Sequence, residues 1–250
     1  MKLLGNMSRV ADLENKASLL RLLRPMPDAR VLEVGPGEEN LAVKAGQMLG
    51  SKSTVGLEYP GCAAAANKPG FAVSECDLNA ERWPFDDGSF DVILTNQVLE
   101  HITNTDHFVK EIARLLSDRG YAIISVPNLG SISNIAMLLA TFQPNHCHVS
   151  DEYRGIGNPL SAQRMVRWTA PTRLHLRMFT IRALSDLVRA HGLKVERVHG
   201  GSYGVPLISR LMATVDPWHS VYANIRCSRA TPSQSGNGAA GATGAAAGNG

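Results

Sequence analysis

Short apolar segments alternate with amphipathic ones along most of the chain. Five almost wholly apolar segments predict strands at 30–34, 53–57, 71–76, 90–94 and 121–126. Apolar residues at helical spacing predict helices at 8–24, 40–49, 106–116 and 180–191. Towards the C-terminus we expect a strand at 193–198, a helix at 205–215 and a last strand at 220–227.

This alternation is typical of an α/β fold. Strands that are apolar on both faces occur in parallel sheets covered by helices on both sides. We therefore expect a Rossmann-like, doubly wound and mostly parallel sheet of seven strands with helices on both faces. Ligands of such sheets bind at the carboxyl ends of the strands, so the residues that follow each strand are the first candidates for a site.

The pattern also divides the chain into segments. Residues 1–27 form an N-terminal helical segment, with Ser8 as a helix cap and Pro25 and Pro27 after its end. Residues 28–230 form the main domain. Residues 127–178 interrupt the alternation and are rich in Asn, Gly, Ser, Arg and His, which predicts a lid or ligand-binding insertion. Residues 231–250 have no charged, aromatic or large aliphatic side chain, which predicts a disordered tail.

The composition excludes several classes of protein. Of the 250 residues 44 % are hydrophobic, enough for a folded core, and a net charge of +3 does not indicate a DNA-binding protein. The four cysteines share no CxxC spacing and predict neither disulfides nor a zinc site. The longest apolar run, residues 135–142, is far shorter than the ~20 residues that cross a bilayer, and no signal-peptide core follows Met1. We expect a cytoplasmic protein without a membrane span.

Charge is distributed unevenly along the chain. Residues 1–141 carry 13 basic and 17 acidic side chains, whereas residues 142–182 carry six arginines against two acidic side chains. Arginine binds phosphate and carboxylate groups well. We therefore expect an anionic ligand near the insertion, with Arg173 and Arg177 as candidate binding residues. A solvated surface with ion pairs at helix ends is the structural alternative.

The strongest motif is a glycine turn after the first strand. Residues 31–37 read Val-Leu-Glu-Val-Gly-Pro-Gly, and Glu58 follows Gly37 by 21 residues at the end of the next strand. Glycine lets a ligand approach the backbone closely, and an acid at this strand end can accept hydrogen bonds from both ribose hydroxyls. Asp77, after the third strand, is placed to reach an adenine amino group. The structural alternatives are a plain tight turn for the glycines, a solvated acid for Glu58 and a helix cap for Asp77.

A nicotinamide dinucleotide is the first rival ligand for such a turn. Its fingerprint requires Gly-x-Gly-x-x-Gly, and the last position is Asn40 here. Glu33, at the tip of the first strand, would repel a pyrophosphate. The same carboxylate suits a cofactor that carries ammonium and sulfonium charges.

Taken together, the motifs resemble those of the class I S-adenosylmethionine-dependent methyltransferases over about residues 28–200. Four further segments match. They are 76–78 (Cys-Asp-Leu), 83–93 (Trp-Pro-Phe-Asp-Asp-Gly-Ser-Phe-Asp-Val-Ile), 95–102 (Thr-Asn-Gln-Val-Leu-Glu-His-Ile) and 116–128 (Leu-Ser-Asp-Arg-Gly-Tyr-Ala-Ile-Ile-Ser-Val-Pro-Asn). Residues 175–180 (His-Leu-Arg-Met-Phe-Thr) resemble a stretch of methyltransferases associated with glycan and cell-envelope assembly.

The resemblance implies S-adenosylmethionine as cofactor and methylation, at oxygen, of a small metabolite or a glycan or cell-envelope precursor. It also implies peripheral contact with a membrane or with glycan-assembly enzymes. Methylation of RNA or protein, and a non-catalytic regulator that keeps the fold, are the alternatives. The cofactor-binding residues that it implies are Glu33, Gly35, Pro36, Gly37, Glu58, Asp77, Leu78, Asn96 and Gln97.

Methyl transfer to a hydroxyl also needs a group that removes a proton, usually His, Asp or Glu. His101 and His175 are the candidate catalytic residues, because His101 follows the fourth strand near the expected methyl position and His175 precedes the late helix. Helix packing is the alternative for His101. His146 and His148 flank one cysteine, but two histidines without a nearby third ligand are weak evidence for an ion. We therefore expect no metal.

Overall fold

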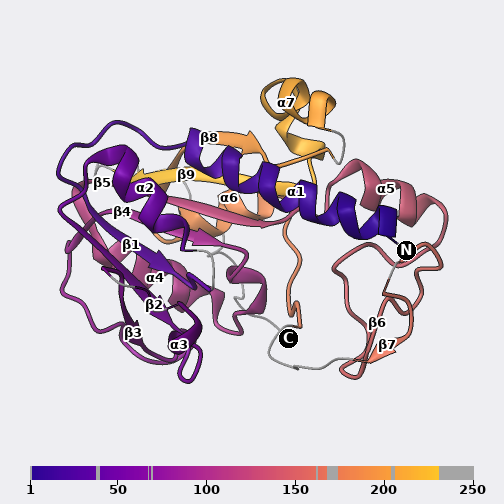
Figure 1. Cartoon of the computed structure of the whole chain (residues 1–250), viewed down its shortest axis with the longest axis horizontal. Coiled ribbons are helices and arrows are strands. Elements are labelled where there is room, and N and C mark those ends of the chain that lie inside the picture. The colour runs from indigo at the N-terminus through magenta and orange to yellow at the C-terminus, as the bar shows by residue number, and fades with distance from the viewer. Residues whose placement is uncertain are drawn as a thin grey trace, which may run out of the picture.

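A twisted sheet forms the centre of the molecule (Figure 1). The computed structural model describes residues 2–37, 40–66, 68, 70–161, 163–167, 174–203 and 206–230. Within them, the main sheet has seven strands in the order β3-β2-β1-β4-β5-β9-β8. The strands are β1 (Arg30–Val34), β2 (Ser53–Glu58), β3 (Ala72–Glu75), β4 (Phe90–Asn96), β5 (Leu116–Pro127), β8 (Leu193–Gly200) and β9 (Tyr222–Arg229).

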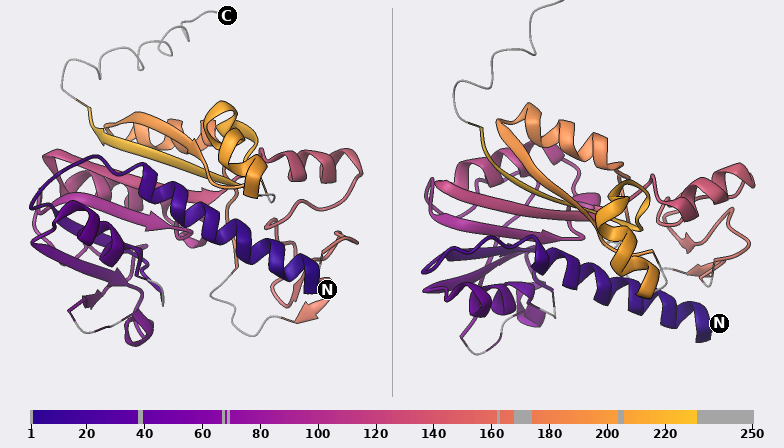
Figure 2. Two further views of the ribbon diagram at one scale, coloured as in Figure 1. Left: turned by 45° about the horizontal axis from the view of Figure 1, so that its top comes forward. Right: turned by 90° about the horizontal axis from the view of Figure 1, so that it is seen from above.

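The sheet confirms the predicted mostly parallel fold. Strands β1 to β5 pair in parallel, and β9 runs antiparallel to both β5 and β8. The strands are apolar because both faces are covered, as Figure 2 shows. The helices are α1 (Lys2–Arg21), α2 (Leu41–Leu49), α3 (Ala63–Ala66), α4 (Thr105–Leu115), α5 (Ile132–Leu139), α6 (Ile181–Ala190) and α7 (Pro206–Val215).

Two apolar clusters, one on each face, hold the helices to the sheet. On one face, Phe108 and Ile112 of α4 and Leu184 of α6 pack against the strands. On the other face, Leu19 of α1 and Ala45 of α2 do the same. Each of these side chains is nearly or fully buried. The amphipathic helices predicted from the sequence therefore occupy both sides of the sheet.

The first helix is confirmed, but its start and its buried face differ from the sequence prediction. α1 begins at Lys2, so Ser8 lies inside the helix and is not its cap. Leu13 is 57 % exposed, although it belongs to the apolar spacing that predicted the helix. Polar contacts orient α1 instead, because Asn15 and Ser18 are buried and Ser18 Oγ donates a hydrogen bond to Gly201 O (3.3 Å).

The insertion predicted at 127–178 contains regular structure that its polar composition concealed. α5 begins after Ser131, whose Oγ accepts a hydrogen bond from Asn134 N (3.3 Å). β6 (Tyr153–Arg154) pairs with β7 (Val166–Arg167) in an antiparallel ladder. α5 and this ladder lie to one side of the main sheet (Figures 1 and 2). The predicted tail, residues 231–250, lies outside the described residues.

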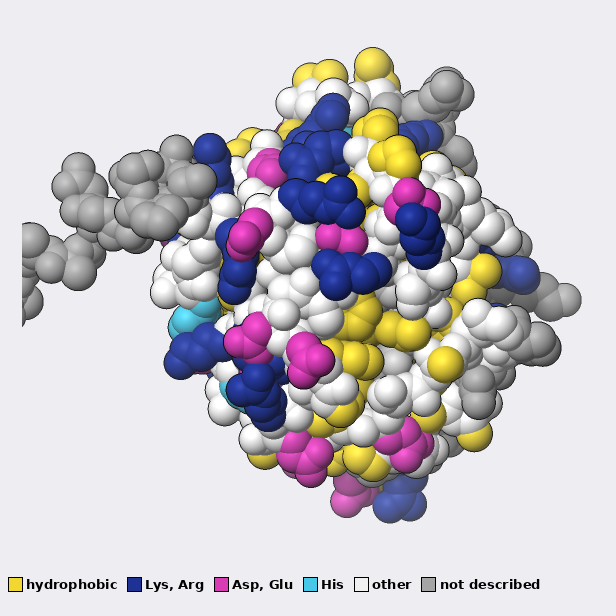
Figure 3. Space-filling view, turned by 90° about the vertical axis from the view of Figure 1, so that its left-hand side faces the viewer, with side chains coloured by type: hydrophobic (Ala, Val, Ile, Leu, Met, Phe, Trp, Pro, Cys, Tyr) yellow, Lys and Arg dark blue, Asp and Glu magenta, His cyan; other side chains and the backbone are white. Residues whose placement is uncertain are grey.

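Ion pairs join the strands at the amino end of the sheet. Asp91, at the start of β4, accepts hydrogen bonds from Arg30 and Arg119 (3.1 and 3.3 Å). Burial raises the pKa of Asp91, but hydrogen bonds from Arg30, Ser117 and Arg119 outweigh it and hold the pKa below its usual value. Basic side chains lie beside acidic ones on the face at this end (Figure 3). Among the described helices, none is both long and apolar enough to cross a membrane.

Candidate cofactor and acceptor site

The predicted glycine turn joins β1 to α2 and has the backbone conformation that its glycines permit. Gly35 and Gly37 have φ angles of +70° and +52°, which residues with a side chain rarely adopt. Gly35 N donates a hydrogen bond to Leu57 O (2.8 Å). A Cβ at Gly35 would lie 2.4 Å from Val98 Cγ2, whereas a Cβ at Gly37 would meet no atom of the described residues within 4 Å. The turn is therefore closed by Val98 at Gly35 and open at Gly37.

Glu33, predicted to face the ammonium group of the cofactor, is bound to the start of α2. Its side chain is buried, and Oε2 accepts a hydrogen bond from Ala42 N (2.7 Å). Burial raises the pKa of Glu33 to about 7, although hydrogen bonds from the Ala42 and Leu41 backbones lower it. The carboxyl group thus fastens α2 behind the turn, and its contact with the cofactor stays a prediction.

The two acids predicted to bind adenosine lie at the ends of neighbouring strands. Glu58 Oε2 accepts a hydrogen bond from Gly37 N (3.2 Å), so this carboxylate lies beside the glycine turn. Asp77 Oδ1 accepts a hydrogen bond from Asn79 N (2.9 Å), and Leu78 beside it is buried. Asp77 therefore stabilises its own turn, and it is not the helix cap that was the structural alternative, because no helix begins between β3 and β4 in the described residues. Its contact with adenine and the contact of Glu58 with ribose stay predictions.

Asn96 and Gln97, at the end of β4, belong to a buried network that includes α1. Asn15 Nδ2 donates to Asn96 Oδ1 and to Ser125 Oγ, each at 3.0 Å. Gln97 Nε2 donates to Ser125 Oγ at 3.1 Å, and Asn224 Nδ2 donates to Asn15 Oδ1 at 2.9 Å. The sequence analysis did not identify Asn15 as part of this site. No local signal distinguishes Asn15, because Asp12, Glu14 and Lys16 of α1 are polar as well.

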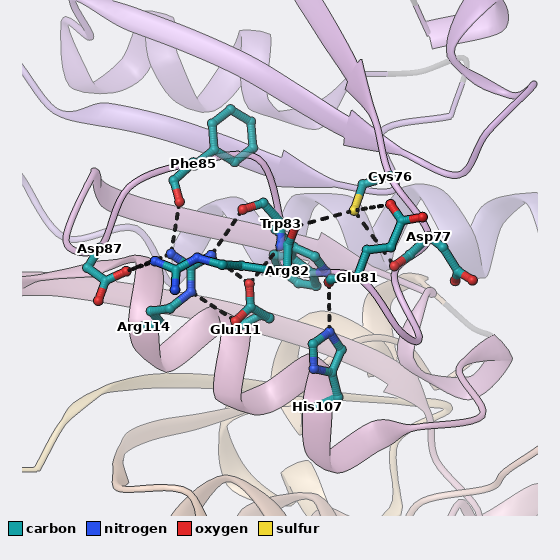
Figure 4. Close-up of polar contacts among 10 residues, drawn as sticks. All are labelled: Cys76, Asp77, Glu81, Arg82, Trp83, Phe85, Asp87, His107, Glu111 and Arg114. Atoms are coloured by element: carbon teal, nitrogen blue, oxygen red, sulfur yellow. Dashed lines mark hydrogen bonds and ion pairs between the residues drawn. The ribbon is translucent and has the colours of Figure 1, made fainter.

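The loop after β3 is fastened to α4 (Figure 4). Arg114 donates hydrogen bonds to Trp83 O (3.1 Å) and Phe85 O (2.8 Å). Trp83 N donates to Glu111 Oε2 (2.8 Å), and Glu111 forms an ion pair with Arg114 at 2.6 Å. The segment 83–93 noted in the sequence therefore has a structural explanation, since it holds the loop that follows Asp77.

The segment before α6 is fastened along η1 (Leu99–His101), a short helix just beyond β4. Leu176 N donates a hydrogen bond to Glu100 O (2.8 Å), and His101 Nδ1 lies 2.9 Å from Leu174 O. These contacts bring His175 next to η1, although the two segments are more than 70 residues apart in sequence. The fold thus joins the two predicted catalytic histidines.

Four histidines meet at this point, and we call His101, His146, His148 and His175 the histidine cluster. The ring centroid of His175 lies 4.8 Å from that of His101, 5.1 Å from that of His146 and 5.2 Å from that of His148. Burial, together with the other three histidines, lowers the pKa of His175 to about 2. Glu100 is fully buried beside the cluster, and burial raises its pKa to about 8.

The arginines of the insertion do not form one binding patch among the described residues. Arg177 Nη2 donates a hydrogen bond to Thr103 O (2.7 Å), so the Arg177 side chain binds the backbone just after η1. Arg167 pairs with Glu152, and Arg182 lies over the ring of Trp218. Arg173 lies outside the described residues. The predicted binding of an anionic acceptor by Arg173 and Arg177 therefore rests on composition.

Comparison with known proteins identifies the family. The sequence model of a family described as "Methyltransferase domain" matches residues 7–198. The chain belongs to this methyltransferase family. It is an S-adenosylmethionine-dependent methyltransferase by family, and S-adenosylmethionine is its cofactor, as the motifs predicted.

The chain is also similar to two curated proteins of Mycobacterium tuberculosis. Both are named as probable S-adenosylmethionine-dependent methyltransferases and are 33 % identical to this chain over 112 residues. The match covers 42 % of this chain and 39 % of each relative. The chain therefore aligns with about two fifths of the length of these relatives.

Solved structures share the fold. A methyltransferase from Thermotoga maritima, described as a possible histamine N-methyltransferase, has a TM-score of 0.59 at 20 % identity, covering 89 % of this chain and 90 % of that one. A toxoflavin-precursor N1-methyltransferase from Burkholderia thailandensis has a TM-score of 0.53 at 16 % identity, covering 88 % and 78 %. The [4+2]-cyclase SpnF has a TM-score of 0.54 at 15 % identity, covering 89 % and 81 %. These likenesses confirm the Rossmann-like fold.

The residues at the turn fit S-adenosylmethionine. The backbone at Gly37 is open, and the carboxylate of Glu58 lies next to it. Thr95 Oγ1, at the end of β4, is buried and has no hydrogen-bond partner among the described residues. A polar ligand at the carboxyl ends of β1 and β4 would therefore find both an open approach and an unused hydrogen-bonding group.

Proposed function

We propose that this chain transfers a methyl group from S-adenosylmethionine to an oxygen atom of a small metabolite or a glycan precursor. The observation that carries the proposal is the place of the histidine cluster. His101 lies three residues after Val98, which contacts Gly35 of the cofactor turn. Polar side chains that can hold an acceptor are therefore next to the turn that would hold the donor.

The cofactor, when bound, supplies a methyl group that is already activated by a positively charged sulfur. The protein then has to bind the cofactor and the acceptor, align the two reacting groups and exclude water. We assign the ribose hydroxyls to Glu58, the adenine to Asp77 and Leu78, and the close backbone approach to Gly35, Pro36 and Gly37. Asn96 and Gln97 border the crevice, and their hydrogen bonds to Asn15 and Ser125 support them from α1.

The acceptor side needs a group that takes up the proton of a hydroxyl. His175, with a pKa lowered to about 2, is a poor proton acceptor at neutral pH. We therefore assign the proton-accepting role to His101, whose ring is oriented by Leu174 O, and the binding of the acceptor to His175. Because Leu176 and Arg177 hold the segment on the Glu100 carbonyl, the two rings keep a fixed relation.

The class of acceptor rests on two features. The insertion that carries His146 and His148 has a net positive charge in sequence, which favours an acidic metabolite or a phosphorylated glycan precursor. Methylation of RNA or protein is the competing function. RNA recognition depends on aromatic stacking and basic side chains together. In the insertion Tyr153 precedes Arg154 and Trp168 follows Arg167, so the test includes RNA as an acceptor.

Calorimetry with S-adenosylmethionine and S-adenosylhomocysteine tests the first step. We expect both to bind, and no binding at millimolar concentration would contradict the proposal. The second step measures release of S-adenosylhomocysteine with sugar phosphates, acidic phenols and short RNA as acceptors. Turnover that occurs only with RNA would move the function to the competing class. Cofactor binding without turnover on any acceptor would favour a non-catalytic regulator.

A further inference from the structure

Beside the cofactor turn, the fold brings together ligand groups that the sequence keeps far apart. One ligand atom each of Glu100, His101 and His175 lie within 4.8 Å of one another. The ring of His146 stacks on that of His175 with an interplanar angle of 17°, and His148 contacts the same ring. The sequence showed only the pair His146 and His148, without a third ligand nearby. The folded chain brings further candidate ligands to the same place.

Two buried polar groups in this set have no explanation in the surrounding protein. Both carboxylate oxygens of Glu100 are buried without a hydrogen-bond partner among the described residues, and so is Nδ1 of His175. Glu100 is 0 % exposed. A buried carboxyl group without partners is costly, and native proteins keep such groups mainly where they bind an ion or act chemically.

His101 has the second contact that is typical of a metal ligand. Histidines that bind metals usually donate their other ring N–H to a backbone carbonyl or a carboxylate, which fixes the tautomer. His101 Nδ1 lies 2.9 Å from Leu174 O, a carbonyl oxygen that can only accept a hydrogen bond, so Nδ1 is the protonated nitrogen. The lone pair of the ring is therefore on Nε2, the nitrogen that can bind an ion.

From this geometry we propose that Glu100, His101 and His175 bind one divalent transition-metal ion, for which Zn²⁺ is the best match. Two imidazoles and one carboxylate, with a further position left for a small ligand, form a known type of zinc site. Mg²⁺ and Ca²⁺ prefer oxygen ligands and match this set poorly. Ligand atoms around Zn²⁺ are about 3.4 Å apart when each bond is about 2.1 Å. The described spacing of up to 4.8 Å therefore has to close by small side-chain rotations.

The ion would change the role of His101 in the proposed function. An acceptor hydroxyl that binds a metal ion has a lowered pKa, so a side-chain base is no longer required for its deprotonation. His101 would be a ligand, and the released proton would pass to solvent or to a neutral imidazole such as His148. Metal binding itself does not depend on which acceptor is methylated.

The test measures binding directly on the untagged full chain after treatment with a chelator. We expect one Zn²⁺ or Co²⁺ per chain by elemental analysis and calorimetry, and little binding of Mg²⁺. Glu100→Gln and His175→Gln should each weaken Zn²⁺ binding by ~100-fold. His107→Gln, which changes a histidine on α4 outside the cluster, should leave binding unchanged.

The outcomes separate this inference from the proposed function. Binding that survives both substitutions, equal binding of Mg²⁺, or no binding at all would overturn the metal site and leave methyl transfer untouched. A thiolate charge-transfer band with Co²⁺ would show that a cysteine is a ligand and would overturn the ligand set. Tight Zn²⁺ binding in a chain that binds no S-adenosylmethionine would support the metal site and contradict the proposed function.

Discussion

Alanine substitutions at Gly35 and Gly37 separate the structural from the ligand-binding role of the glycine turn. Both glycines have a positive φ, so both substitutions introduce backbone strain. Their surroundings differ, because a Cβ at Gly35 would overlap Val98 Cγ2 at 2.4 Å and a Cβ at Gly37 would meet no atom of the described residues within 4 Å. The two variants should therefore fail in different ways.

Backbone strain and side-chain overlap together set the expected loss in the free energy of unfolding. Backbone strain for alanine in the left-handed region costs about 1–2 kcal/mol at each position. Overlap with a packed side chain adds about 1–3 kcal/mol at Gly35. We expect Gly35→Ala to lower the free energy of unfolding by about 2–5 kcal/mol and Gly37→Ala by about 1–2 kcal/mol. Gly37→Ala should in turn weaken S-adenosylhomocysteine binding by about tenfold or more, because the added methyl occupies the approach to the backbone.

Urea denaturation and calorimetry measure the two effects independently. A double-mutant cycle with Val98→Ala isolates the overlap, since Val98→Ala removes the clashing methyl groups but leaves the φ strain at residue 35. Gly35→Ala should therefore cost less in the Val98→Ala background than in the wild type. Equal destabilisation by the two glycine variants, an additive cycle, and unchanged cofactor affinity of Gly37→Ala would together refute this account of the turn.

Three further substitutions test other parts of the site. Glu58→Ala should weaken S-adenosylhomocysteine binding by about 10–100-fold, because charge-assisted hydrogen bonds are lost. The control is Glu75→Ala, which removes a comparable loop-binding carboxylate from the end of β3 and should leave this binding unchanged. Arg114→Ala should destabilise the chain by about 3–5 kcal/mol, and Arg82→Ala, whose ion pair is exposed, by under about 1 kcal/mol. Without metal, the free energy of unfolding should fall between pH 6.5 and about 8, by up to about 1.4 kcal/mol per pH unit. Folded Glu100 and, up to about pH 7, folded Glu33 retain protons there that the unfolded chain has released. In denaturation series at several pH values, Glu100→Gln should therefore remove the part of the fall between about pH 7 and 8.

The sheet could be predicted because each strand carries its own signal. Residues 31–34, 90–95 and 120–127 are buried, and a mostly apolar run is the local expression of burial on both faces. The direction of β9 carries no such signal, because an apolar strand reads the same whether its neighbour is parallel or antiparallel. α5 was missed for a related reason. Its apolar residues Leu138 and Leu139 are exposed, so the segment lacks a polar face opposite a buried one.

The buried face of α1 shows where periodicity fails. The helical spacing of apolar residues predicted that Leu13 faces the core, but the helix is turned so that Asn15 and Ser18 face the sheet. Three hydrogen bonds join Asn15 to Asn96, Ser125 and Asn224, and a buried polar group is costly without such partners. The partners lie up to 209 residues away in sequence, so a local pattern cannot reveal them.

The cofactor side of the site could be predicted from the sequence, whereas the acceptor side could not. Glycines and acids that follow successive strands occupy one edge of a parallel sheet by necessity, so Gly35, Gly37 and Glu58 could be assigned from spacing alone. The histidine cluster has no such rule, because His146 and His148 come from an insertion and His175 from the segment held on the Glu100 carbonyl. Glu100 gains its importance only when the fold buries it without a partner. A residue that resembles an ordinary helical glutamate in the sequence thus becomes the strongest argument for a metal ion, since its carboxyl group is buried and has no hydrogen-bond partner among the described residues.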